Sequence, residues 1–151
     1  MKIPYTVLGA CDPAIAAAYP SNRQISLPLI KFALAHKNMK YEFKALIDSG
    51  ADISIFPMDV AELLEIDLRH ASTFSVKGIN GQNINCKLNE VTMMFDRHTF
   101  NLTVGFSTAA TGARAFGAAG IIGHRGFFDQ FIVSFNYKAQ YFEVKKPFRL
   151  N

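Results

Sequence analysis

Apolar and polar residues alternate along much of this chain, which is the pattern of strands that bury one face. From Arg23 to Ile47 the apolar residues fall at alternate positions on either side of a polar break at His36-Lys37-Asn38. This pattern predicts two strands joined by a hairpin. Behind Pro57, apolar residues recur at helical spacing over Met58 to Ile66, and we expect one short helix there.

The segment Thr73 to Leu88 predicts a second hairpin, and the parity of its apolar residues selects the turn. A two-residue turn at Asn80-Gly81 would place apolar residues opposite polar ones. A three-residue loop, Ile79-Asn80-Gly81 with Gly81 in the left-handed conformation, places apolar residues opposite apolar ones. We therefore expect the longer loop. The expected pairs are Phe74 with Cys86, Val76 with Ile84 and Gly78 with Gln82. Such a surface hairpin, with glycines at its tip, could close over a ligand.

More strands are expected in the second half of the chain. Val91 to Phe106 predicts a hairpin, and its expected facing pairs are Met93 with Leu102 and Val91 with Val104. The Ala- and Gly-rich stretch Thr108 to Gly120 predicts a mobile loop, whose glycine spacing fits neither a dinucleotide fingerprint nor a phosphate loop. An aromatic helical turn over His124 to Phe131 and strands at Ile132 to Phe135 and Tyr141 to Val144 should follow. The chain is therefore expected to be all-β with one or two short helices.

The composition fits one compact domain. The chain has 151 residues, of which 50% are apolar and 19% charged, and these values exclude a disordered protein. Its net charge of +4 comes from scattered basic residues rather than a patch, so no nucleic-acid partner is expected. No stretch approaches the roughly 18 apolar residues of a membrane span, and no membrane partner is expected. Cys11 and Cys86 lack the spacing of zinc ligands or of a disulfide framework, so we expect no metal and no cofactor.

The first residues need separate treatment. Residues 1–22 are expected to form a loosely structured leader or an interface arm ahead of a domain over residues 23–151. Leu8-Gly9-Ala10-Cys11 resembles a lipoprotein cleavage box, but Pro4 interrupts the apolar run that should precede it. We therefore expect a cytoplasmic protein.

The most informative stretch is Leu46 to Ser54, which reads Leu-Ile-Asp-Ser-Gly-Ala-Asp-Ile-Ser. It places Asp48 in a tight turn directly after an apolar strand. The strand gives the turn a rigid base, Gly50 lets the backbone pass close to a second chain, and Ser49 can hydrogen-bond across the turn. An aspartic peptidase presents its catalytic carboxylate in this way.

Three features, in this order, resemble the retropepsin family of retroviral-type aspartic peptidases and their bacterial relatives. They are the Asp-Ser-Gly-Ala-Asp turn at Asp48 to Asp52, the glycine-tipped flap at Gly78 to Gln82, and the apolar-apolar-glycine element at Ile121 to Gly123. The resemblance covers roughly Arg23 to Lys146. It implies a single-lobe acid-protease β-barrel that functions as a two-fold homodimer.

The resemblance also implies roles for the turn. Asp48 matches the catalytic aspartate, Ser49 the hydroxyl that locks the two active-site loops together, and Gly50 the backbone carbonyl that contacts substrate. Two carboxylates held close share one proton, so one can activate a water while the other protonates the substrate. Because the chain has one such motif, the second must come from an identical subunit, with the site on the dimer axis.

Further site residues follow from the same resemblance. The residues that match the substrate-binding positions are Ala51, Asp52, Gly78, Ile79, Asn80 and Gly81. Those that match the structural element beside the site are Ile121, Ile122, Gly123, His124 and Arg125. Asp52 should pair with His124 or Arg125, and the sequence leaves both open. A histidine would make this contact weaken as the pH rises.

These features predict a homodimeric aspartic endopeptidase that hydrolyses polypeptides with a water activated by the Asp48 pair. The alternative is a catalytically weak or inactive dimer of the same fold that binds peptides. The intact Asp48-Ser49-Gly50 sequence favours the enzyme, because a binding module could lose the carboxylate freely.

Overall fold

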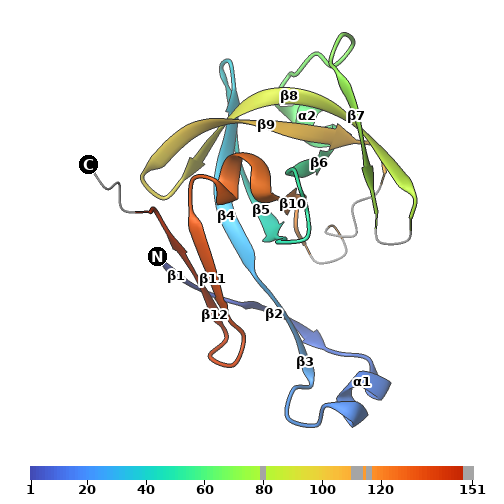
Figure 1. The fold of residues 1–151 in the computed structure, drawn as a ribbon, viewed down its shortest axis with the longest axis vertical. Helices are drawn as coiled ribbons and strands as arrows, with labels where there is room; N and C mark the ends of the chain where they lie inside the picture. Colours follow the sequence, from blue (N-terminus) through green and yellow to red (C-terminus); the bar gives the residue numbers. More distant parts are fainter. Residues whose placement is uncertain (79–80, 110–113, 115–116, 148–151) are drawn as a thin grey trace.

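The computed structural model describes residues 1–78, 81–109, 114 and 117–147. Seven strands form its main sheet: β4 (Leu29–His36), β5 (Met39–Ile47), β6 (Ile55–Pro57), β7 (Thr73–Lys77), β8 (Asn83–Phe95), β9 (His98–Ser107) and β10 (Ile121–Ile122). Their order is β4-β5-β10-β6-β9-β8-β7, and β4 also pairs with β8 (Figure 1). The additional pairing closes the sheet into a barrel.

Two smaller sheets and three short helical segments complete the described fold. The strands are β1 (Lys2–Pro4), β2 (Thr6–Ala10), β3 (Gln24–Leu27), β11 (Ile132–Asn136) and β12 (Tyr141–Lys145). The helical segments are α1 (Pro13–Ala18), α2 (Met58–Leu63) and the π-helical turn η2 (His124–Phe128). The prediction of an all-β fold with short helices is confirmed. Within the described residues, no helix has the length and apolar character needed to cross a membrane.

The first predicted hairpin is confirmed as β4 and β5, but its first strand begins only at Leu29, because Gln24–Leu27 forms the separate strand β3, which pairs with β2. Phe32 lies opposite Phe43, and the pairing continues to His36 opposite Met39. The chain turns at Lys37, which adopts a φ of 51°. Most of β4 is buried because it packs in the closed barrel, whereas the first two-thirds of β5 alternates between exposed and half-buried positions. At its end β5 becomes mostly buried, where it leads into Asp48.

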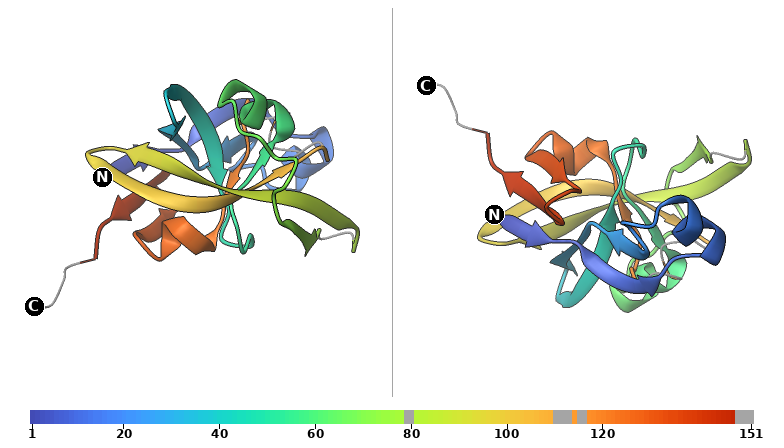
Figure 2. Two further views of the ribbon diagram at one scale, coloured as in Figure 1. Left: turned by 90° about the horizontal axis from the view of Figure 1, so that it is seen from above. Right: turned by 90° about the horizontal axis from the view of Figure 1, so that it is seen from below.

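The glycine-tipped hairpin has the predicted register. Phe74 lies opposite Cys86 and Val76 opposite Ile84. At the tip, the Gly78 N–H donates to the Gln82 carbonyl at 2.9 Å, and Gly81 has the expected positive φ of 77°. Figure 2 shows the hairpin formed by β7 and β8 extending from one end of the barrel. The other two tip residues of the prediction, Ile79 and Asn80, lie outside the described residues.

The predicted register of the next hairpin is wrong by two residues. Val91 lies opposite Leu102 and Met93 opposite Phe100. The reason is the turn: Phe95 pairs with His98, so only two residues connect the strands, and Asp96 takes a φ of 53°. Aspartate tolerates this left-handed conformation better than most residues. Because a shift of two residues preserves the faces of a strand, the predicted apolar face is still buried.

The aromatic segment after β10 is only partly helical. Arg125 and Gly126 have non-helical backbone angles within η2, and Gly126 has a φ of 87°. A Cβ at Gly126 would lie 2.6 Å from the Cβ of Leu102, so only glycine fits there. Phe127 is fully buried, and its ring centroid lies 5.0 Å from that of Phe131. This aromatic packing holds the segment that follows β10 in place.

The expectation of a loosely structured leader is wrong. β1 pairs with β12, so that Lys2 lies opposite Glu143, and Ile3 packs against the main core. β2 pairs with β3, and this pair extends from the barrel together with α1 (Figure 1). The first strand thus belongs to the same packed structure as the C-terminal strands. The boundary at residue 22 and the role of an interface arm stay predictions.

Beside the backbone pairing of β1 with β12, Glu143 provides a charged contact that titrates in acid. The carboxylate of Glu143 lies between Lys145, with which it forms an ion pair, and Lys2, at 3.7 Å. The hydrogen bond from Lys145, with the further charge of Lys2, lowers the pKa of Glu143 below its ordinary 4.5. Because the folded state holds the proton less tightly than the unfolded state, the stabilisation is complete above that value and is lost as the pH falls below it.

We therefore expect Glu143→Gln to lower the midpoint of urea unfolding near neutral pH, and the difference from wild type to narrow in acid. Urea titrations at about pH 7 and about pH 3 measure this. Glu42→Gln is the matched control, since Glu42 is an exposed strand carboxylate with no ion pair in the described part of the chain. A wild-type advantage over Glu143→Gln that stays the same at both pH values would contradict the prediction.

Candidate active site

Asp48 lies at the end of β5 in a turn that holds its carboxylate in place. The Oδ1 atom of Asp48 accepts a hydrogen bond from the Gly50 N–H at 2.8 Å, and the Ala51 N–H donates to the Asp48 carbonyl at 3.2 Å. Asp48 is half-buried, while Ser49 and Gly50 are exposed. Within the described chain, no hydrogen bond or ion pair engages Oδ2. One carboxylate oxygen is therefore fixed and the other is available.

The loop is held from behind by β10, which lies between β5 and β6. Ile122 pairs in parallel with Ile47, and Ile121 pairs in antiparallel with Ile55. The backbone N–H of Asp48 itself donates to the Ile122 carbonyl at 3.0 Å. Two segments that are far apart in the sequence thus meet directly at the candidate catalytic residue. The predicted element of Ile121, Ile122 and Gly123 lies beside the turn.

Gly123 marks a close backbone approach between β10 and the loop that follows Asp48. A Cβ at this position would lie 2.5 Å from the carbonyl carbon and oxygen of Ile53 and 2.8 Å from the oxygen of Ala51. These are backbone atoms that cannot move aside without displacing the loop. The Gly123 N–H donates to the hydroxyl of Ser54 at 3.1 Å, so a hydrogen bond also connects the two segments.

Ser54 is a site residue to which the sequence analysis gave no role. It is fully buried, and its hydroxyl satisfies the Gly123 donor. Its carbonyl also accepts from the Gly105 N–H at 2.9 Å. In the sequence, Ser54 is a single hydroxyl residue in an otherwise apolar stretch. That pattern could have indicated its role, because a buried polar side chain must find a hydrogen-bond partner.

Asp52 pairs with Arg125 and not with His124. The Nε of Arg125 donates to Oδ1 at 3.0 Å and to Oδ2 at 3.1 Å, and its backbone N–H donates to the Asp52 carbonyl at 2.9 Å. The His124 ring instead packs edge-on against Phe128, with centroids 5.2 Å apart. Both partners of the ion pair are largely exposed, so its contribution to stability is at most about 1 kcal/mol. A pH-dependent contact between His124 and Asp52 is therefore not formed.

An apolar cluster joins the glycine-tipped hairpin of β7 and β8 to the candidate active-site loop. Ile53, Ile55 and Cys86 are buried together. The half-buried residues packed against them come from the flap strands and from β10: Val76, Ile84, Leu88 and Ile121. Cys86 packs in this cluster as a small apolar side chain, and its burial raises the pKa of its thiol.

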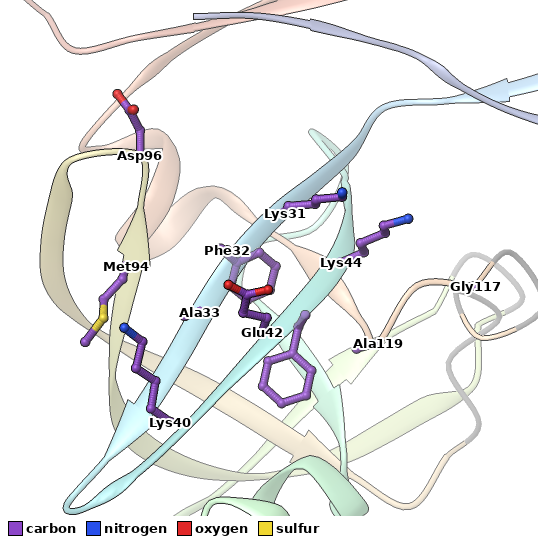
Figure 3. A pocket seen from close by; sticks show the side chains of 11 residues that line it. Lys31, Phe32, Ala33, Lys40, Glu42, Lys44, Met94, Asp96, Gly117 and Ala119 are labelled. Carbon is purple, nitrogen blue, oxygen red and sulfur yellow. The ribbon is translucent and has the colours of Figure 1, made fainter.

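A pocket of about 720 Å³ lies elsewhere, on the outer side of the hairpin of β4 and β5 (Figure 3). Lys31 and Lys44 face each other across the two strands, and Glu42 lies between this pair and Lys40 in the close view. None of the predicted site residues lines this pocket. In the described part of the chain, no group of three or more acidic, histidine or cysteine side chains is placed to hold a metal ion.

Comparison with known proteins supports the fold. No family model matches the sequence, and no curated protein matches it. A solved structure of the retroviral EIAV protease, complexed with the inhibitor HBY-793, superposes with a TM-score of 0.50. The alignment covers 65% of this chain and 82% of that chain at 16% sequence identity. The chain has a retropepsin-like fold. At this identity the retropepsin-like likeness concerns the fold alone.

We expect Ser54→Ala to destabilise the protein by about 1–3 kcal/mol, because it leaves the buried Gly123 N–H without an acceptor. Urea unfolding at neutral pH measures the change. Ser75→Ala is the control, since Ser75 is an exposed serine on the flap strand β7 and its loss should change stability by less than about 0.5 kcal/mol. Equal effects of the two substitutions would show that the hydroxyl of Ser54 has no structural role.

Proposed function

We propose that this protein is a homodimeric aspartic endopeptidase in which each subunit contributes one Asp48. The observation that carries the proposal is the Asp48 turn. A carboxylate with one oxygen held by the Gly50 N–H and the other available lies on a rigid support of paired strands. The glycine-tipped hairpin of β7 and β8, which would serve as the flap, supports the same proposal.

A single subunit has half of the groups that the reaction needs. Hydrolysis of a peptide bond by carboxylates requires one group to accept a proton from water and another to protonate the carbonyl oxygen. The exposure of Ser49 and Gly50 leaves the turn open to a second copy of itself. Two-fold symmetry would then bring the two Asp48 carboxylates together.

The chemistry follows from the shared proton. Two adjacent carboxylates cannot both ionise, so one Asp48 is protonated and its partner is not. The ionised carboxylate takes a proton from water as the oxygen attacks the scissile carbonyl carbon, and the protonated one donates to the carbonyl oxygen. In the second step the carbon–nitrogen bond breaks, the amine leaves with a proton, and the dyad returns to one shared proton.

An extended peptide is the substrate that suits this geometry. The flap and the active-site loop are joined by the cluster of Ile53, Ile55 and Cys86, which holds the base of the flap close to the loop. A peptide between them could add main-chain hydrogen bonds in the manner of an additional strand. Binding would thus depend on backbone contacts, with side-chain pockets giving specificity.

The decisive test compares wild type with Asp48→Asn on a diverse peptide mixture at pH values from about 3 to 7. Asp48→Asn should reduce cleavage at least about a hundredfold, because it removes both proton acceptor and donor. Sedimentation in the same buffers should show that the variant still dimerises. Together these results would place the chemistry on the carboxylate rather than on assembly.

Asp67→Asn is the matched control for this experiment. The carboxylate of Asp67 accepts the N–H of Arg69, two residues on, at 3.0 Å, just as Asp48 accepts that of Gly50. The control should keep full activity. A wild-type dimer that cleaves no peptide at any of these pH values would overturn the proposal and favour a peptide-binding dimer of the same fold.

A further inference from the structure

A cavity of about 590 Å³ begins at the active-site loop and continues along the outer side of the barrel. Asp52 and Ile53 line its inner end, and Phe74 and Leu88 line it from the two flap strands. Asp48 does not line it. The cavity is therefore connected to the candidate site but lies to one side of the reacting groups, where a residue distant from the scissile bond would be bound.

One wall of the cavity is apolar. Ile53 and Leu102 are buried beneath it. Phe74, which also lines the cavity, is 38% exposed. A wall of this kind suits the methylene stem of a long side chain.

The rim of the cavity carries an excess of negative charge. Asp52 is paired with Arg125, so these two charges compensate each other. Glu90 and Asp129 also line the cavity, and neither takes part in an ion pair within the described residues. This local excess contrasts with the net charge of +4 of the whole chain.

The position of Glu90 is fixed by its neighbours on the sheet. Its Oε1 accepts a hydrogen bond from Nδ2 of Asn101 at 3.3 Å, and Oδ1 of Asn101 in turn accepts from the hydroxyl of Thr92 at 2.9 Å. The carboxylate is thus held at the rim through a neutral partner. No cation of the described residues forms an ion pair with it.

We infer that this cavity is a subsite for a lysine or arginine side chain of the bound polypeptide. The apolar wall would contact the stem, and Glu90 and Asp129 would bind the ammonium or guanidinium group. The inference rests on the proposed function and narrows it, because it makes the preferred substrates peptides with a basic residue at a distance from the scissile bond. The long, charged side chain is the feature recognised.

The test uses two synthetic pools of fluorescent random decapeptides that differ only at one fixed position, which is lysine in one pool and norleucine in the other. The fixed position is moved along the peptide in turn. Cleavage rates and binding anisotropy are measured for wild type and for the double variant Glu90→Gln/Asp129→Asn. We expect wild type to prefer lysine about tenfold at one position, equivalent to about 1.4 kcal/mol, and the double variant to lose that preference.

The control is Glu42→Gln/Asp12→Asn, which removes the same number of charges from exposed positions outside the cavity and should retain the preference. Cleavage without a lysine preference, or a preference that survives in Glu90→Gln/Asp129→Asn, would overturn the subsite and leave the endopeptidase proposal intact. Binding that prefers lysine and depends on Glu90 and Asp129, without any cleavage, would support the subsite and overturn the endopeptidase. Absence of both cleavage and selective binding would overturn both.

Discussion

The insertion of β10 between β5 and β6 is the constraint on which the rest of the site depends. Because Ile122 pairs with Ile47 and accepts the backbone N–H of Asp48, the candidate catalytic turn is held by a segment from the other half of the chain. Gly123 permits this approach, since any side chain there would meet backbone atoms of Ile53 at 2.5 Å. The candidate catalytic turn and strands β5, β10 and β6 are therefore parts of one packed unit.

This constraint leaves the opposite face of the turn open. Ser49 is exposed, and Asp48 has a carboxylate oxygen with no partner in the described residues. The turn is therefore held by β10 on one side and is open on the other. Beside it, the fixed pair of Asp52 and Arg125 neutralises the inner end of a cavity whose rim stays acidic. The supported turn, its exposed face and the charged cavity are thus neighbours, because Asp52 belongs to the same loop as Asp48 and lines the cavity.

Local features of the sequence were sufficient to predict the structure wherever one physical rule decided it. The flap register followed from the parity of its apolar residues and from a glycine suited to the left-handed conformation, and Gly81 has that conformation. The turn after β5 followed from Asp48 and Gly50, because an aspartate can accept the N–H two residues on and does so here. These interactions connect residues that are neighbours in the sequence, so their geometry is encoded locally.

Other features needed the folded chain. A turn at Asp96 shifted a hairpin register that apolar parity could not distinguish from its neighbour two residues away. The choice of Arg125 over His124 depended on a backbone pairing with the active-site loop, and the buried role of Ser54 on the approach of Gly123. The sequence by itself determined the β-class, the glycine-tipped hairpin and the Asp48 turn, because these arise from short-range periodicity and turn chemistry. Only the tertiary structure decided which distant segments support them, because such contacts depend on how the closed barrel brings remote backbones together.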